Sequence, residues 1–171
     1  SSPSRGLGDV YKRQIEDLLN NLDGIIVLTG SIRCFFGSLF NKGLFNEIEE
    51  LLIKLKEKFE DNIYIEIQRH NNINEKDFEN FNLKISEKLE LPIIASNEVY
   101  YLDKDMFEAH DALMCIGEKT YVNDLNRTKL TNQHYFKSSE VMIELLSDLP
   151  EALENNFNLP YRCSYKPNFS K

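Results

Sequence analysis

The chain has 171 residues, of which 42% are hydrophobic and 11% aromatic, so it is long and apolar enough to bury a core and does not have a disordered composition. Its formal net charge of −8 argues against a direct grip on nucleic acid, because that binding depends on Lys and Arg contacts to phosphates. No apolar run approaches the roughly 20 residues that a membrane-spanning helix needs, so no membrane partner is expected.

The first 14 residues, SSPSRGLGDVYKRQ, show neither helical nor strand periodicity. Their mixture of Ser, Pro, Gly and basic residues predicts a disordered leader. The stretch also resembles a translated library adapter, so residues 1–14 are interpreted as a non-native leader. Residues 15–160 are then expected to form one domain, and residues 161–171 a linker.

Apolar runs and helical stripes alternate along the rest of the chain. Strands are predicted over residues 25–30, 62–70 and 92–97, and helices over residues 15–24, 31–43, 44–61, 73–90, 103–118 and 138–157, the last in two parts separated by Pro150. Asn74 is expected to cap the helix over 73–90, and Gly117 to end the helix over 103–118. Strands that alternate with helices predict a parallel α/β sheet or barrel. Three strands are too few to close a barrel, so the chain is interpreted as part of a larger domain.

The three cysteines, Cys34, Cys115 and Cys163, are far apart and form no Cys-x-x-Cys pair. Their odd number and spacing favour reduced thiols in a cytoplasmic protein. A zinc site or a catalytic cysteine is the alternative.

Polar residues follow each predicted strand, in the ranges 29–31, 68–70 and 97–100. In a β/α barrel, the carboxyl ends of the strands carry the chemistry. His70 is therefore either a metal ligand at the barrel rim or a histidine that hydrogen-bonds at the start of a loop. His110 lies in an amphipathic helix and is interpreted as structural, whereas His134 lies in a polar loop and favours neither role.

Two acidic clusters, Asp103/Asp105 and Asp148/Glu151, lie at predicted helix starts, where the helix dipole explains them without catalysis. No phosphate-binding Walker motif, Gly-x-Ser-x-Gly or His-Glu-x-x-His occurs in the chain.

Several segments together carry a family resemblance: IYIEIQRH, LPIIASNEVYYL, EAHDALMCIGE, HYFKSSEVMIELLSDLPEALENNFNL and RCSYKP. In this order they resemble the alpha subunit of bacterial DNA polymerase III, in the second half of its N-terminal polymerase-and-histidinol-phosphatase (PHP) domain. The resemblance runs from about Ile15 to Pro167. The form of the segments beginning at Asn97 and His110 is most similar to the alphaproteobacterial branch.

This resemblance implies a partial PHP domain, part of a distorted (β/α)7 TIM-like barrel, with a linker that leads to a polymerase domain absent from the chain. The parent would be a DNA-directed DNA polymerase, a magnesium-dependent nucleotidyltransferase of chromosomal replication in the cytoplasm. Its partners would be the other holoenzyme subunits, including the proofreading exonuclease, and DNA bound through absent domains. The family's polymerase aspartates are missing here, so neither catalytic nor cofactor-binding residues are expected in this piece.

The resemblance also implies a zinc or manganese site that has lost ligands. The family pattern places Cys at Ser31, His at His70, and Asn-Asp-x-His at the segment from Asn97 to Tyr100. A hydroxyl is a poorer soft-metal ligand than a thiolate, and a neutral tyrosine does not replace imidazole. Glutamate in place of aspartate moves the carboxylate by about 1.5 Å, one C–C bond length. His70 and Glu98 are therefore predicted as vestigial metal ligands.

A structural scaffold or a docking element for the exonuclease is the function expected of this piece. The alternative is a metal-dependent phosphoesterase of the PHP superfamily.

Overall fold

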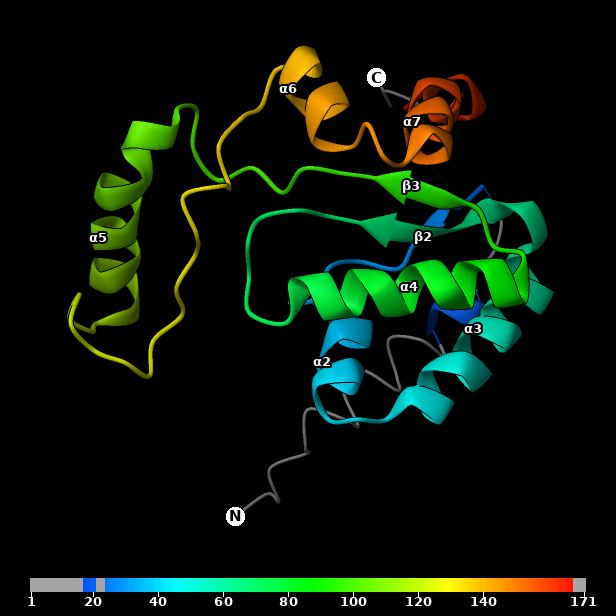
Figure 1. Cartoon of the computed structure of the whole chain (residues 1–171), viewed down its shortest axis with the longest axis horizontal. Coiled ribbons are helices and arrows are strands. Elements are labelled where there is room, and N and C mark those ends of the chain that lie inside the picture. Colours follow the sequence, from blue (N-terminus) through cyan, green and yellow to red (C-terminus); the bar gives the residue numbers. More distant parts are fainter. Residues whose placement is uncertain (1–16, 21–23, 168–171) are drawn as a thin grey trace. The chain divides into compact units, whose positions relative to one another are not determined.

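The computed structural model (Figure 1) describes residues 17–20 and 24–167, and the chain divides into two units. The first unit comprises the chain up to Glu66 together with Ile73–Leu91. The second comprises Ile67–Asn72 and the chain from Pro92 onward. The predicted leader, residues 1–14, lies outside the described residues. Of the helix predicted over 15–24, residues 17–20 are described and are helical.

In the first unit, strand β1 (Val27–Leu28) pairs in parallel with β2 (Ile63–Ile67), with Val27 opposite Ile63. β1 is shorter than the predicted strand over 25–30: after one further backbone bond, from Thr29 N to Tyr64 O at 3.2 Å, side chains make the contacts between the two segments. Glu66 N donates to Thr29 Oγ1 at 2.9 Å, and Gly30 N donates to Glu66 Oε2 at 2.9 Å. Gly30 has φ +83°, a left-handed conformation that turns the chain out of the strand.

The helices of the first unit are α2 (Phe35–Asn41), α3 (Phe45–Phe59) and α4 (Glu75–Leu89), with a short 3₁₀ helix, η1 (Glu60–Asn62), after α3. The helical spacing in the sequence predicts one apolar stripe for α3. Four of its residues are buried and two, Leu44 and Leu51, are partly exposed; the buried ones are Ile48, Leu52, Leu55 and Phe59. Asn74 does precede α4, but it makes no side-chain cap, because its φ is 62° and its amide donates to Asn41 Oδ1 instead.

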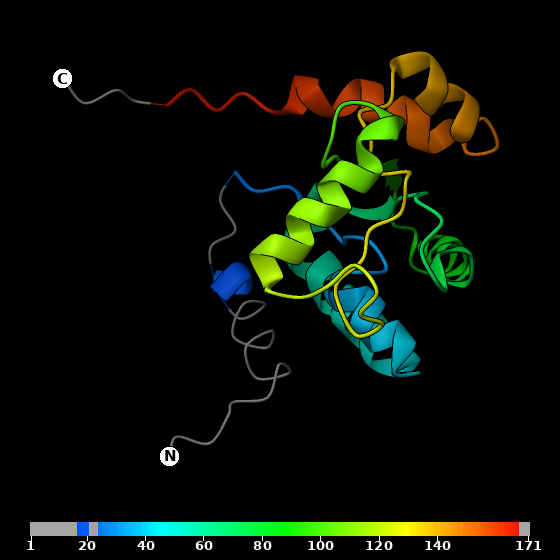
Figure 2. The same cartoon turned by 90° about the vertical axis from the view of Figure 1, so that its left-hand side faces the viewer.

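The second unit contains β3 (Ile93–Ala95), the 3₁₀ helix η2 (Lys104–Met106), α5 (Phe107–Glu118), α6 (Ser139–Leu145) and α7 (Pro150–Arg162). The prediction that Gly117 ends the helix was wrong: it lies inside α5, and Lys119 adopts the left-handed conformation with φ 56° that ends it. Ser138 caps α6 by accepting from Val141 N. α7 extends to Arg162, into the range assigned to the linker, and residues 163–167 after it form neither helix nor strand (Figure 2).

α7 packs on β3 and hydrogen-bonds its backbone (Figure 1). Asn156 Oδ1 accepts from Ala95 N at 3.1 Å, Glu151 Oε1 accepts from Ile93 N at 3.4 Å, and Asn155 Nδ2 donates to Ile93 O at 2.8 Å. An exposed strand edge leaves backbone N–H and C=O groups unpaired, which favours pairing with other chains. The α7 side chains bond these groups of β3, as a neighbouring strand would. This contact also gives Glu151 a partner beyond the helix dipole.

The stretch between α5 and α6 is irregular, as predicted, but it is fastened to α5 by an ion pair. Arg127 donates from Nη1 and Nη2 to the two carboxylate oxygens of Asp111, each at 2.6 Å. The two side chains are 2% and 10% exposed. Arg127 also donates to the carbonyls of Val122 and Thr128, so it holds its own loop in shape.

Replacing Asp111 by Asn should reveal this pair through its pH dependence. Hydrogen bonding from Arg127 holds the pKa of Asp111 below its ordinary value of 3.8. The stability that the pair adds is therefore present above pH 3.8 and is lost as the pH falls below that value. In circular-dichroism melts of the chain, Asp111→Asn should lower the melting temperature by roughly 5 °C at neutral pH and by much less at about pH 3. Asp105→Asn, on the exposed η2, is the control, and an equal penalty at both pH values would contradict the assignment.

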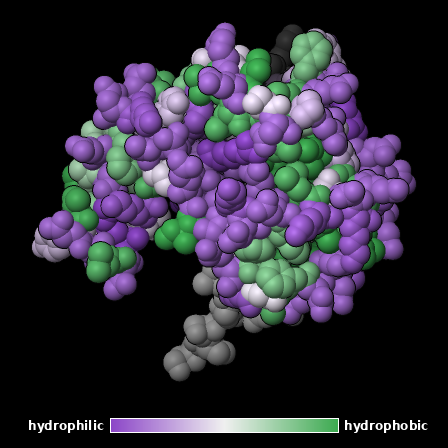
Figure 3. Space-filling model, viewed as in Figure 1, coloured by the Kyte–Doolittle hydropathy of each residue, from purple (hydrophilic) through white to green (hydrophobic). Residues whose placement is uncertain are grey.

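The parallel pairing and the alternation of strands with helices confirm an α/β arrangement. None of the described helices combines the length and the apolar composition that crossing a membrane requires. The face seen in Figure 3 is mostly hydrophilic with scattered hydrophobic patches, in keeping with the net charge of −8.

Candidate functional site

Five polar side chains of the second unit lie beyond the ends of β2 and β3 and are called here the strand-end cluster: His70, Asn97, Glu98, His134 and Lys137. His70 follows β2, Asn97 and Glu98 follow β3, and the other two lie between α5 and α6. A short parallel contact brings this later segment alongside the chain after β3: Tyr101 bridges to Tyr135, and Tyr100 N donates to His134 O at 2.9 Å.

The two histidines of the cluster form a stacked pair. Their ring centroids lie 4.1 Å apart and the ring planes differ by 4°. His70 is 1% exposed and His134 is 0% exposed, so both imidazoles belong to the core of the unit. Thr131 Oγ1 donates to His70 O, which further fixes the segment that carries His134.

The amide of Asn97 organises the hydrogen bonds around His70. Its Oδ1 accepts from Lys137 Nζ at 3.2 Å, and its Nδ2 donates to Tyr135 O at 3.0 Å, so both contacts fix the amide in one orientation. His70 Nε2 lies 3.0 Å from the same Oδ1. Because this oxygen only accepts, Nε2 carries the proton and donates. A protonated nitrogen has no lone pair for a metal ion.

Lys137 is a buried cation, with 7% of the residue exposed. Besides Asn97, its ammonium donates to Gln133 O and lies 4.5 Å from the centre of the Tyr135 ring. Carbonyl oxygens and an aromatic face both stabilise a positive charge, so the ammonium is well solvated by the protein.

Glu98 provides the carboxylate of the cluster, and its side chain is 33% exposed. Oε1 accepts from Tyr100 OH at 2.7 Å, and Oε2 lies 3.7 Å from His134 Nδ1. His134 Nδ1 is also 3.1 Å from Glu98 O, a carbonyl that can only accept, so this nitrogen is a donor. Tyr101, the residue after Tyr100, is buried, and this burial raises the pKa of its hydroxyl. The same hydroxyl donates to Thr131 O at 2.6 Å.

The predicted site residues fall in both units. Three of them lie in the second unit, and each contacts His134: the His70 ring stacks on it, the Glu98 carboxylate lies near its Nδ1, and the Tyr100 ring meets it edge to face. Ser31 belongs to the first unit, where its Oγ accepts from Arg33 N and lies 3.5 Å from Cys34 Sγ. Within residues 17–20 and 24–167, no three His, Cys, Asp or Glu side chains are grouped so that they could hold a metal ion. The assignment of His70 and Glu98 as vestigial metal ligands remains a prediction.

Sequence reasoning missed His134 and Lys137, the two members of the cluster from the irregular segment. Both are buried, whereas Phe136 between them is 66% exposed. The available signal was weak: a histidine and a lysine three residues apart just before a helix cap. Only the contact with the chain after β3 gives them a role.

Other predicted features have clear places outside the cluster. The three cysteines are free thiols, as predicted. His110 lies on α5, with its ring centroid 5.7 Å from that of Tyr100 and 5.4 Å from that of Tyr101. Asp148 forms a bidentate ion pair with Arg69 at 2.7 and 2.8 Å, which lowers the pKa of its carboxyl.

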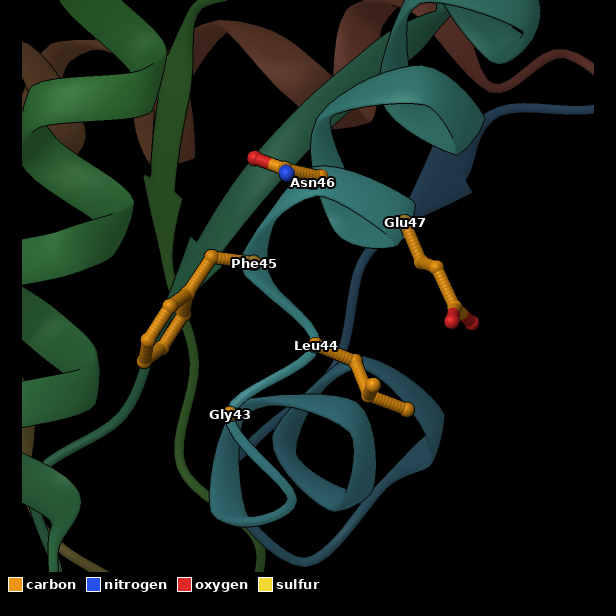
Figure 4. Close-up of a pocket in the computed structure, with 5 residues that line it drawn as sticks. All are labelled: Gly43, Leu44, Phe45, Asn46 and Glu47. Carbon is orange, nitrogen blue, oxygen red and sulfur yellow. The ribbon is translucent and has the colours of Figure 1, made fainter.

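A shallow pocket in the first unit lies at the turn between α2 and α3 (Figure 4). Its lining is the five consecutive residues from Gly43 to Glu47, and Glu47 is the one ionisable group among them. Leu44 and Glu47 point to one side of the turn and Phe45 to the other (Figure 4), so the side chains do not converge on a common point. This pocket gives no basis for a reaction.

Comparison with known proteins gives long matches. The chain is 34% identical over 161 residues to DNA polymerase III subunit alpha of Haemophilus influenzae, covering 94% of this chain and 14% of that protein. It is 37% identical over 154 residues to the same subunit of Rickettsia bellii, covering 88% and 13%. The Pseudomonas aeruginosa subunit is 32% identical over 150 residues, covering 87% and 13%. No protein-family profile matches the chain.

These matches show that the chain, an α/β fold, is similar to one part of a bacterial polymerase subunit. The resemblance to subunit alpha of DNA polymerase III is thereby confirmed over about nine tenths of the chain. The chain spans about one seventh of the length of these relatives.

Proposed function

We propose that the chain is a piece of a replicative DNA polymerase III alpha subunit and that it serves there as a structural PHP half-barrel. The parent would extend DNA by template-directed nucleotidyl transfer with Mg²⁺ held by residues outside this chain. The observation that supports the polymerase assignment is an identity of 32–37% that runs along most of the chain in several relatives.

The scaffold role is supported by the way the strand-end cluster uses its donor atoms. His70 Nε2 donates to Asn97, Glu98 Oε1 accepts from Tyr100, and His134 Nδ1 donates to the Glu98 backbone. These bonds occupy one nitrogen of each imidazole and one carboxylate oxygen. The two rings are stacked face to face, so their other nitrogens do not direct lone pairs at a shared point between the rings.

Exposed apolar side chains on and after α5 also agree with the proposal that this chain is part of a larger protein. Leu113, Ile116 and Leu125 are 63%, 75% and 97% exposed. In the relatives, the remaining six sevenths of the polypeptide are available to cover such a surface. The other holoenzyme subunits, including the proofreading exonuclease, are the partners proposed for the parent.

The test is to express the complete polypeptide encoded by the source gene and to assay two reactions. Template-dependent primer extension with Mg²⁺ is expected, without hydrolysis of p-nitrophenyl phosphate in Zn²⁺ or Mn²⁺. The alternative, a PHP-type metal phosphoesterase, predicts hydrolysis that requires the metal and is lost in His70→Ala, with no primer extension.

A further inference from the structure

The strand-end cluster differs from the metal site that the resemblance implies, because it already contains a buried positive charge, the Lys137 ammonium. Two imidazoles, one carboxamide and one carboxylate are donor types that suit a divalent metal. One nitrogen of each imidazole, His70 Nε2 and His134 Nδ1, is nevertheless directed at a protein oxygen, and a lysine lies close to His70.

Lys137 holds its charge close to the candidate ligand His70. The ammonium Nζ and the imidazole Nε2 contact the same oxygen, Asn97 Oδ1, at 3.2 and 3.0 Å. A divalent ion bound to His70 Nε2 would have to displace the proton of that nitrogen. It would also lie within a few ångströms of the ammonium, in a buried setting where like charges repel strongly.

The stacked imidazoles add a geometric obstacle. A metal ion lies in the plane of an imidazole that binds it, along the lone pair of a ring nitrogen. The rings of His70 and His134 are parallel and 4.1 Å apart, face to face, so they do not direct nitrogen lone pairs at a shared point between them.

We propose that the Lys137 ammonium is a built-in cation that takes the place of the metal ion in this cluster, with Asn97 as the oxygen that receives it. The proton on His70 Nε2, the nearby ammonium and the parallel rings do not fit a metal ion at His70 Nε2 or between the two rings. The lysine gives Asn97 Oδ1 and Gln133 O the positive partner that the ion would supply. This inference rests on the proposed scaffold role and extends it, because it names what holds the strand ends together without metal.

The experiment is hydrogen exchange by mass spectrometry on the complete polypeptide, read from the peptides that cover residues 67–72, 96–102 and 131–137. Lys137→Met removes the charge at similar side-chain length, and Lys137→Arg retains it. Lys129→Met, in the same irregular segment but exposed, is the matched control. Exchange in these peptides should be about 30-fold faster in Lys137→Met, at most about fivefold faster in Lys137→Arg, and unchanged in Lys129→Met. An excess of ZnCl2 or MnCl2 should leave exchange in the unmodified protein unchanged.

Two outcomes would overturn the proposal. One is slower exchange in the unmodified protein when Zn²⁺ or Mn²⁺ is added, because that would mean metal binding. The other is equal exchange in Lys137→Met and either Lys129→Met or Lys137→Arg, because the charge would then not matter. Primer extension by the same preparation keeps the two proposals apart: a polymerase whose cluster binds metal would refute the built-in cation and leave the polymerase assignment standing.

Discussion

Replacing His134 by alanine should open the strand ends of the second unit and speed local hydrogen exchange there about 100-fold. His134 is 0% exposed, it stacks on His70, and its Nδ1 donates to Glu98 O. Truncating a buried ring of this size costs about 3 kcal/mol through lost packing and a new cavity, and the Glu98 carbonyl also loses its donor. Exchange by mass spectrometry in the peptides that cover 67–72 and 96–102 measures the effect.

The control is His110→Ala, which removes the same side chain from a more exposed position on α5. His110 touches tyrosine rings, and its Nδ1 has no hydrogen-bond partner, so its loss should cost about 1 kcal/mol or less. Similar rates in the two variants would mean that the stacked histidine pair contributes no special stability.

A second large effect is expected at a glycine of the first unit. Gly37 lies in α2, and a Cβ at this position would approach Ile32 O to 2.0 Å and Ile32 C to 2.3 Å. These are backbone atoms that cannot rotate away, so Gly37→Ala must shift α2 or the preceding turn. We expect a loss of about 3 kcal/mol or more in the free energy of unfolding, at the upper end of overpacking effects.

Gly117→Ala is the matched control, because it places the same methyl group on another helical glycine. No atom lies within 4 Å of a Cβ at Gly117, and α5 continues past it. Alanine is the better helix former, so this variant should gain about 0.5 kcal/mol. Urea denaturation of the chain, followed by circular dichroism, should shift in opposite directions for the two variants, and a neutral Gly37→Ala would show that the turn before α2 is able to yield.

A helix was predictable from sequence where the spacing of its own apolar residues marks the face that is buried. The stripe from Ile48 to Phe59 is read from local spacing, and the same residues are buried in α3. Helix ends were less predictable. Gly117 resembled a stop, yet Lys119 takes the left-handed position, and Asn74 bonds to Asn41 instead of capping α4. In these cases a contact or a backbone conformation that no local pattern encodes decided the outcome.

The location of the candidate site was predictable, and its composition was not. Polar residues after buried strands pointed to His70 and Glu98, and both are in the strand-end cluster. His134 and Lys137 reach the cluster through pairing between chain segments 34 residues apart, Tyr101 with Tyr135. Local sequence patterns do not predict a contact of this kind. The cluster's composition is therefore known only from the folded structure: a lysine and a stacked histidine pair around the amide of Asn97.

The most direct test of the scaffold account is the zinc and manganese content of the complete polypeptide, purified without chelator and compared with its His70→Ala variant. The account predicts far less than one such ion per chain in the unmodified protein, and no difference between the two preparations. One or more ions per chain, lost in the His70→Ala variant, would show a working metal site at the strand ends and would contradict the account.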